Sequence, residues 1–183
     1  MTVPNETPAT SEFPEYIQPY LSLLPAGDIL DLMRQQAAAF AGLPSAAGHL
    51  PDDWTYAPGK WTVRELTVHL AHAERIMGYR AFRFAHGDDT PLAGFEENDY
   101  VAASTANARS LSDIASELLH LREANISFFS SLADWQWLRI GTANSSPISV
   151  QALAYGIVGH AAHHLTILRD RYRVPLELGW QVA

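Results

Sequence analysis

The stretch "GHAAHHLTILRDRY", residues 159–172, places three histidines within five consecutive positions of a segment with helical periodicity. An α-helix turns about 100° per residue, so the apolar face of this segment can be located from its sequence. That face is marked by Val150, Leu153, Ile157, Ala161 and Leu168. His164 lies near its centre and His160 about 60° to one side, whereas His163 is displaced by about 120°. We therefore predict that His160 and His164 point into the protein interior together.

Helical periodicity extends over four segments and determines the expected fold. The segments are residues 28–43, 62–87, 110–132 and 149–173. The second has a clear start signal, because Thr62 and Glu65 have the spacing of a capping box, in which each side chain satisfies a free backbone N–H. Strand signals are weak, since no Asn-Gly or Asp-Gly pair separates two alternating runs. The pattern predicts an all-α protein, an antiparallel four-helix bundle with one long crossover.

The domain organisation is expected to be simple. Residues 1–24 are rich in proline and polar residues, which predicts an N-terminal tail and a lead-in that is extended or a broken helical turn. Residues 25–183 are predicted to form a single bundle domain. The segments 44–60, 88–108 and 134–147 are expected to be loops because of their Pro, Gly, Asn and Asp content.

Composition excludes several classes of function. The net charge is −8, from 12 basic and 20 acidic residues, and no basic cluster occurs, so we expect neither nucleic-acid binding nor attraction to an anionic membrane. The chain has no cysteine, which excludes a thiolate nucleophile or cysteine-ligated zinc site of its own. It has no signal-peptide pattern at its N-terminus and no apolar stretch long enough to span a bilayer, so a cytoplasmic location is predicted.

The second helical segment adds a third inward histidine. Its apolar face is marked by Leu66, Leu70, Ala73, Met77 and Phe84. His69 lies about 60° from the centre of that face and His72 about 120° away. A single inward histidine is more often a hydrogen-bonded core residue, but three buried imidazoles without partners would each lose hydration. We therefore predict that His69, His160 and His164 bind one divalent metal ion and leave coordination positions open, as in catalytic sites.

Two motifs in the chain resemble those of the DinB/YfiT-like family. The stretch "KWTVRELTVHLAHAE" (60–74) is similar to the family's first motif, and "AYGIVGHAAHHLTILRD" (154–170) is similar to its last-helix Gly-His-x-x-x-His motif. The resemblance covers roughly residues 25–175. It implies a four-helix bundle, often dimeric, that carries zinc or nickel on a histidine triad. Carried over by position, the ligands are again His69, His160 and His164.

The resemblance also implies an activity. Characterised relatives include thiol-dependent S-transferases and a maleylpyruvate isomerase, which use low-molecular-weight thiols such as bacillithiol or mycothiol. We therefore expect a metal-dependent enzyme such as a thiol S-transferase, acting on a thiol and a small electrophile and forming a homodimer. Two alternatives stay open: a non-catalytic metal-binding or dimerising bundle, and a metal-dependent hydrolase.

Other residues could also contribute to the site, but each has a simpler structural explanation. Glu65 could orient the second nitrogen of His69, although helix capping is the simpler role. Arg80 falls near the inward face and could bind an anionic substrate or bridge to an acidic residue. The stretch "FEENDY" (95–100) could lie across an end of the bundle or be a solvated loop. Three aromatic residues could line a pocket or simply pack in the core: Trp54, Trp61 and Tyr155.

Overall fold

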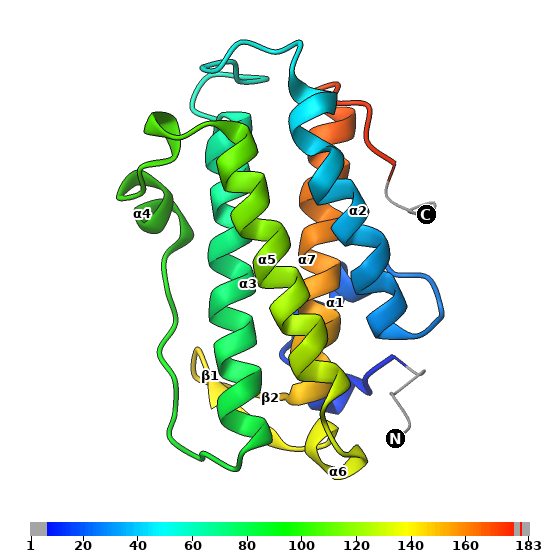
Figure 1. Ribbon diagram of the computed structural model, residues 1–183. Helices are drawn as coiled ribbons and strands as arrows, with labels where there is room; N and C mark the ends of the chain where they lie inside the picture. Colours follow the sequence, from blue (N-terminus) through cyan, green and yellow to red (C-terminus); the bar gives the residue numbers. More distant parts are fainter. Residues whose placement is uncertain (1–6, 178–179, 181–183) are drawn as a thin grey trace.

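Four long helices form the body of the protein in a computed structural model that describes residues 7–177 and residue 180 (Figure 1). They are α2 (Ile29–Ala47), α3 (Val63–Ala85), α5 (Leu111–Ser130) and α7 (Val150–Asp170). Helix α3 packs against α5 and α7, and α2 packs against α5. The chain crosses the length of the bundle between α3 and α5, so these two helices run in the same direction while α2 and α7 run opposite to them (Figure 1). The predicted four-helix bundle with one long crossover is confirmed.

The helices begin where the sequence predicted. Thr62 Oγ1 accepts a hydrogen bond from Glu65 N at 3.1 Å, and Glu65 Oε2 accepts one from Thr62 N at 2.7 Å. Ser110 and Ser149 cap α5 and α7 in the same manner, each accepting a backbone N–H three residues ahead. These side chains satisfy N–H groups that the first helical turn leaves free.

The predicted end of the first helix, at residue 43, was wrong. Helix α2 continues through Pro44 to Ala47. Proline removes one helical hydrogen bond. The added turn also buries Ala47 in the core, beside Leu43, so packing outweighs the local preference for a break.

The segment expected to be the last loop also contains regular structure. Helix α6 (Asp134–Trp137) is followed by an antiparallel hairpin of β1 (Ile140–Ala143) and β2 (Ser146–Ser149). Its turn residues Asn144 and Ser145 have φ of 49° and 62°, a conformation that glycine or asparagine usually supplies. Because Ser145 is unusual there, the turn carried no local signal, and the hairpin is held by buried residues such as Ile148.

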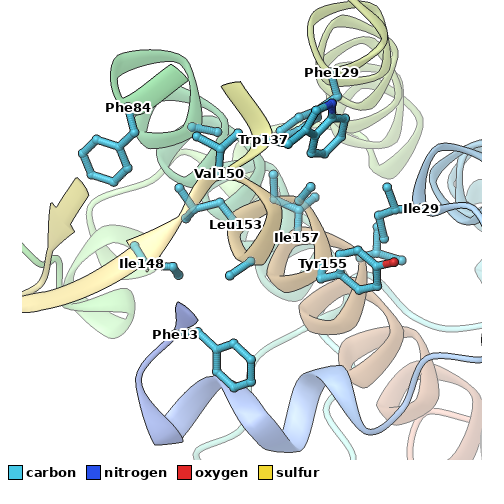
Figure 2. Packing of buried hydrophobic residues seen from close by; sticks show 14 of the residues in the cluster. Phe13, Ile29, Phe84, Phe129, Trp137, Ile148, Val150, Leu153, Tyr155 and Ile157 are labelled. Atoms are coloured by element: carbon cyan, nitrogen blue, oxygen red, sulfur yellow. The ribbon is translucent and has the colours of Figure 1, made fainter. Parts of the chain in front are cut away.

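Residues 1–6 of the predicted N-terminal tail lie outside the described residues, and residues 7–24 form a broken helical turn that packs on α7. It comprises the short helices η1 (Thr10–Glu12), η2 (Glu15–Ile17) and α1 (Gln18–Leu21). Phe13, at its start, joins the same apolar cluster as Ile148 and Leu153 (Figure 2). A Cβ on Gly159 would lie 2.5 Å from the carbonyl oxygen of Tyr20, so glycine permits α1 to lie directly on α7.

A buried polar layer separates two apolar clusters in the core. Arg122 Nε donates to Glu74 Oε1 at 2.9 Å, and Arg122 Nη1 donates to Gln36 Oε1 at 2.6 Å. Gln36 in turn donates to the carbonyl of Val158 at 2.8 Å, and Asn125 donates to the second carboxylate oxygen of Glu74. This polar layer therefore connects all four long helices.

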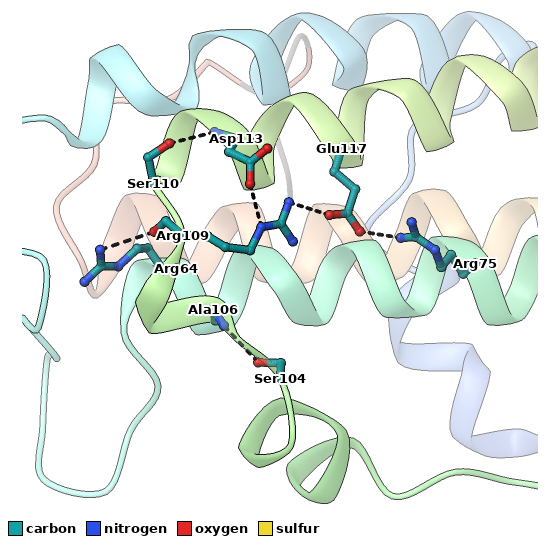
Figure 3. Close-up of polar contacts among 8 residues, drawn as sticks. All are labelled: Arg64, Arg75, Ser104, Ala106, Arg109, Ser110, Asp113 and Glu117. Carbon is teal, nitrogen blue, oxygen red and sulfur yellow. Dashed lines mark hydrogen bonds and ion pairs between the residues drawn. The ribbon is translucent and has the colours of Figure 1, made fainter.

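Helices α3 and α5 are also joined at the surface. Glu117 on α5 pairs with Arg75 on α3 and with Arg109, whose guanidinium also binds Asp113 (Figure 3). The pair of Arg75 with Glu117 thus adds a surface contact to the packing of α3 against α5. Within the described residues, no helix is both long enough and apolar enough to cross a lipid bilayer.

The candidate metal centre

Three histidine nitrogens converge in the interior of the bundle. His69 lies on α3, and His160 and His164 lie one turn apart on α7. The Nε2 atom of His69 is 3.0 Å from Nε2 of His160 and 3.2 Å from Nε2 of His164. Nitrogens bound to one zinc ion at about 2.0–2.1 Å are themselves roughly 2.9–3.4 Å apart, so these spacings fit a shared ion.

The structure brings together the three histidines that the helical faces selected and leaves the other two outside. His163 packs edge-on against Tyr20, with ring centres 5.5 Å apart, and His72 lies 6.0 Å from the ring of Tyr100. Neither belongs to the group whose ligand atoms all lie within 4.8 Å of one another. The role of the three as metal ligands stays a prediction.

Burial favours the neutral form of the three imidazoles. Burial is the main cause that lowers the pKa of His69, to about 4, with the neighbouring charges of His72 and His163 adding to it. Burial likewise holds the pKa values of His160 and His164 well below the ordinary value. A neutral imidazole has a free lone pair, which is the form that binds a metal.

The close nitrogen contacts are difficult to satisfy with protons alone. A ring nitrogen carries either one proton or one lone pair, so Nε2 of His69 can serve only one of its two neighbours. A cation between the three lone pairs satisfies all of them at once. The donor set therefore fits a divalent ion of the kind that imidazole prefers, such as zinc or nickel.

The second nitrogen of His69 is not held by Glu65. Nδ1 of His69 has no hydrogen-bond partner among the described residues, and the same is true of Nδ1 of His164. The carboxylate of Glu65 binds Thr62 N and the side-chain amide of Asn107. Glu65 thus has the capping role that the sequence favoured.

Glu97 is a site residue that the sequence did not identify. It is the first residue of α4 (Glu97–Ala102), in the crossover, and its Oε2 lies 3.8 Å from Nε2 of His69. Burial raises the pKa of Glu97, and the charge of Glu96 adds to the effect. The stretch "FEENDY" was noted for its acidic and aromatic character, but no local pattern places a crossover residue beside a histidine 28 positions earlier.

Two cavities, each of about 230 Å³, flank the triad. The first cavity is lined by His69, His160 and Glu97 at one end and by Arg80 and Asn144. The second cavity is lined by His164 and Glu97 together with Lys60, Trp61 and Tyr172. Glu97 belongs to both. An ion on the triad would therefore face open space that substrates can enter, with a carboxylate beside it.

The three aromatic candidates differ in role. The ring of Trp61 lies 4.8 Å from that of His69, so Trp61 is a wall of the site. Trp54 packs against Tyr172. Tyr155 is buried in the apolar core, and it does not line either cavity.

Comparisons with known proteins agree with this architecture. The sequence profile of the DinB superfamily matches residues 16–168. Among solved structures, the fold is similar to that of YfiT from Bacillus subtilis, described as "a probable metal-dependent hydrolase with an unusual four-helix bundle topology". That similarity has a TM-score of 0.70 and 21% sequence identity, and it covers 84% of this chain and 89% of YfiT. No protein of curated function matches the chain.

Proposed function

The chain belongs to the DinB superfamily, and we propose that it is a divalent-metal-dependent enzyme that transfers a low-molecular-weight thiol to a small electrophile. The observation that carries this proposal is the convergence of three neutral imidazole nitrogens at the walls of two cavities. A structural zinc site is closed by four protein ligands, whereas three ligands beside open space are typical of catalysis. The geometry therefore favours an enzyme over a non-catalytic bundle.

The histidines and Glu97 have distinct roles in this proposal. His69, His160 and His164 would hold the ion. When bound, the ion would lower the pKa of a thiol or water that it coordinates, so that a nucleophile forms near neutral pH. Glu97 lies close enough to His69 to accept the released proton, and its partial exposure lets that proton pass to solvent.

The presence of two cavities favours transfer between two substrates. The triad and Glu97 separate the first cavity from the second, and each cavity reaches a different histidine of the α7 pair. A thiol and an electrophile could then approach the same centre from two sides and meet there in the correct orientation. Hydrolysis needs only one organic substrate.

Hydrolysis is the second candidate, because the fold resembles that of a protein described as a probable metal-dependent hydrolase. The same three histidines and the same carboxylate suit water as well as a thiol. The two reactions differ in whether an added thiol is consumed, and that difference can be measured directly.

Metal content tests the first part of the proposal. Purified protein without an affinity tag should hold about one divalent ion per chain, since three ligands form one site. Ala substitutions of His69, His160 and His164 should each abolish binding. His163→Ala, adjacent to a ligand on the same helix, is the matched control and should retain the ion. A wild-type protein that binds no zinc or nickel would overturn the proposal.

Activity tests the second part. Metal-loaded protein would be assayed with bacillithiol, mycothiol, glutathione and cysteine against a chromogenic electrophile, and separately with chromogenic esters in the absence of thiol. We expect thiol-dependent turnover that His164→Ala eliminates and that Glu97→Gln reduces about 100-fold or more, the usual size of a lost proton-transfer group. Ester cleavage alone would favour the hydrolase, and turnover in neither assay would favour a non-catalytic protein.

The homodimer, the cytoplasmic location and the lack of nucleic-acid or membrane binding remain predictions. Sedimentation equilibrium would test the dimer, and a filter-binding assay with DNA and RNA would test the predicted absence of nucleic-acid affinity.

A further inference from the structure

We propose that the substrate entering the first cavity carries an anionic oxyacid group, and that Arg80 binds it at the end of the cavity away from the triad. This inference rests on the proposed function and names the substrate class of the same site. It depends on the burial of Arg80, its lack of a counter-ion and its position relative to His69.

Arg80 is a buried cation without a carboxylate partner in the part of the chain that the structure describes. The structure buries two arginines, Arg80 at 8% exposure and Arg122 at 0%. Arg122 is paired with Glu74. Arg80 makes one hydrogen bond, from Nη2 to the carbonyl oxygen of Ala93 at 2.8 Å, and no described acidic residue lies within ion-pair distance of it.

Such an arrangement leaves the guanidinium free to bind an anion in the cavity. Burial lowers the pKa of Arg80, but a guanidinium stays protonated at any physiological pH, so the charge remains. Nε and Nη1 of Arg80 are not closed off from the cavity, so an anion that enters the cavity can bind them and compensate the charge. A guanidinium has five N–H donors in a planar fork that matches a carboxylate or phosphate, and only one is used by Ala93.

Arg80 and His69 lie on the same side of α3 and line the same cavity. Eleven residues separate them, which rotates Arg80 by about 20° from His69 and moves it about 16 Å along the helix. Both side chains lean toward the helix N-terminus, and the longer arginine reaches further back, so the remaining gap is roughly 10–15 Å. The anionic group and the reacting atom would therefore lie at opposite ends of one molecule.

The walls and volume of the first cavity define the rest of that molecule. Apolar side chains line the space between the two ends: Met77, Ile148 and Leu153. An apolar cavity of about 150 Å³ holds benzene, so 230 Å³ accommodates on the order of ten non-hydrogen atoms. The substrate class is thus a small organic acid with an apolar body, the anionic group being a carboxylate or a phosphate.

A purely structural role for Arg80 is the competing explanation. Its hydrogen bond to Ala93 connects α3 to the crossover, and this contact alone could explain why an arginine occupies position 80. The two explanations differ in what they predict for ligand binding. A structural arginine would not discriminate between an anion and a neutral molecule of the same shape.

Calorimetric titration with hexanoate, hexanamide and hexyl phosphate tests the inference. The protein would be the metal-free His164→Ala variant, since His164 does not line the first cavity, and EDTA-treated wild type would be a second background. Hexanoate or hexyl phosphate should bind at least about ten-fold more tightly than hexanamide, a typical effect of a charge-assisted hydrogen bond. The tighter of the two anions identifies the oxyacid. Equal affinity for the anions and the amide would overturn the inference.

Two substitutions on α3 complete the test. Arg80→Met should weaken anion binding at least about ten-fold and leave hexanamide binding unchanged. Arg83→Met is the matched control, because Arg83 lies three residues further along α3 and is paired with Asp88. It should change the affinity neither for the anions nor for hexanamide. If Arg80→Met does not fold, the difference in affinity between hexanoate and hexanamide, measured in protein that retains Arg80, still tests the inference. Because no metal is present, a failure here would leave the metal-dependent function standing.

Discussion

Removal of Arg122 should destabilise the protein strongly, because Arg122 lies at the centre of the polar layer. The side chain is fully buried and binds Glu74, Gln36 and the carbonyl of Met33. In Arg122→Met an apolar chain of similar length would replace it. The carboxylate of Glu74, itself 3% exposed, would then keep only the hydrogen bond from Asn125.

The expected magnitude follows from the unpaired charge. Breaking a buried ion pair by removing one partner costs about 3–5 kcal/mol, which is a large part of the 5–15 kcal/mol that stabilises a typical domain. Replacing both partners by apolar residues is much less costly, so Glu74→Leu/Arg122→Met should be more stable than Arg122→Met alone. The surface pair of Arg75 with Glu117 is the matched control, since Arg75→Met should cost no more than about 1 kcal/mol.

Urea denaturation followed by circular dichroism would measure these differences. The polar layer also reaches the site, because Glu74 is five residues after His69 and Gln36 binds Val158, two residues before His160. We therefore expect weaker zinc binding in Arg122→Met. The reasoning is refuted if Arg122→Met costs less than about 1 kcal/mol, or if the double variant loses as much as the sum of both single variants.

Three further predictions concern the helix contact at α1, pH and the metal. Gly159→Ala should destabilise the protein by about 1–3 kcal/mol, because the new Cβ would meet the Tyr20 carbonyl. Gly42→Ala, whose Cβ would have no atom within 4 Å, should stabilise the protein by about 0.5–1 kcal/mol. Urea denaturation would measure both changes. The free energy of unfolding of the metal-free protein should be highest above about pH 6.5 and should fall as the pH drops toward 4, by up to about 1.4 kcal/mol per pH unit for each buried histidine. The reason is that His69 binds a proton in the unfolded chain at a pH where folded His69, with its lowered pKa, does not. A His69→Gln variant with an equally steep pH dependence would contradict this. Zinc at 100 times its Kd should stabilise the wild type by about 2.7 kcal/mol, and thermal melts with and without EDTA should show this shift in His163→Ala but not in His164→Ala.

Much of the site was predictable from the sequence because helix geometry is local. A residue's direction relative to the apolar face of its own helix follows from a rotation of about 100° per residue. That rule separated His69 from His72, and His160 and His164 from His163, before any packing was known. The capping side chains at Thr62 and Ser110 are equally local, since each bonds within its own first turn.

Features that join distant segments were not predictable in this way. The hairpin at 140–149 forms although its turn contains Ser145 in an unfavourable conformation, because Ile148 is buried against α7. Helix α2 passes through Pro44 for the same reason, since the added turn places Ala47 in the core. In both cases the burial of apolar surface decides against a weak local preference.

The sequence by itself determined four amphipathic helices and the three imidazoles that face inward from two of them, because both depend on periodicity within one segment. Only the tertiary structure decided that Glu97 lies beside His69, that Arg80 is buried with no carboxylate from residues 7–177 paired to it, and that a cavity lies on each side of the triad. These features depend on where the crossover and the hairpin pack against α3 and α7. That placement results from burial summed over many distant contacts, which no single stretch of sequence encodes.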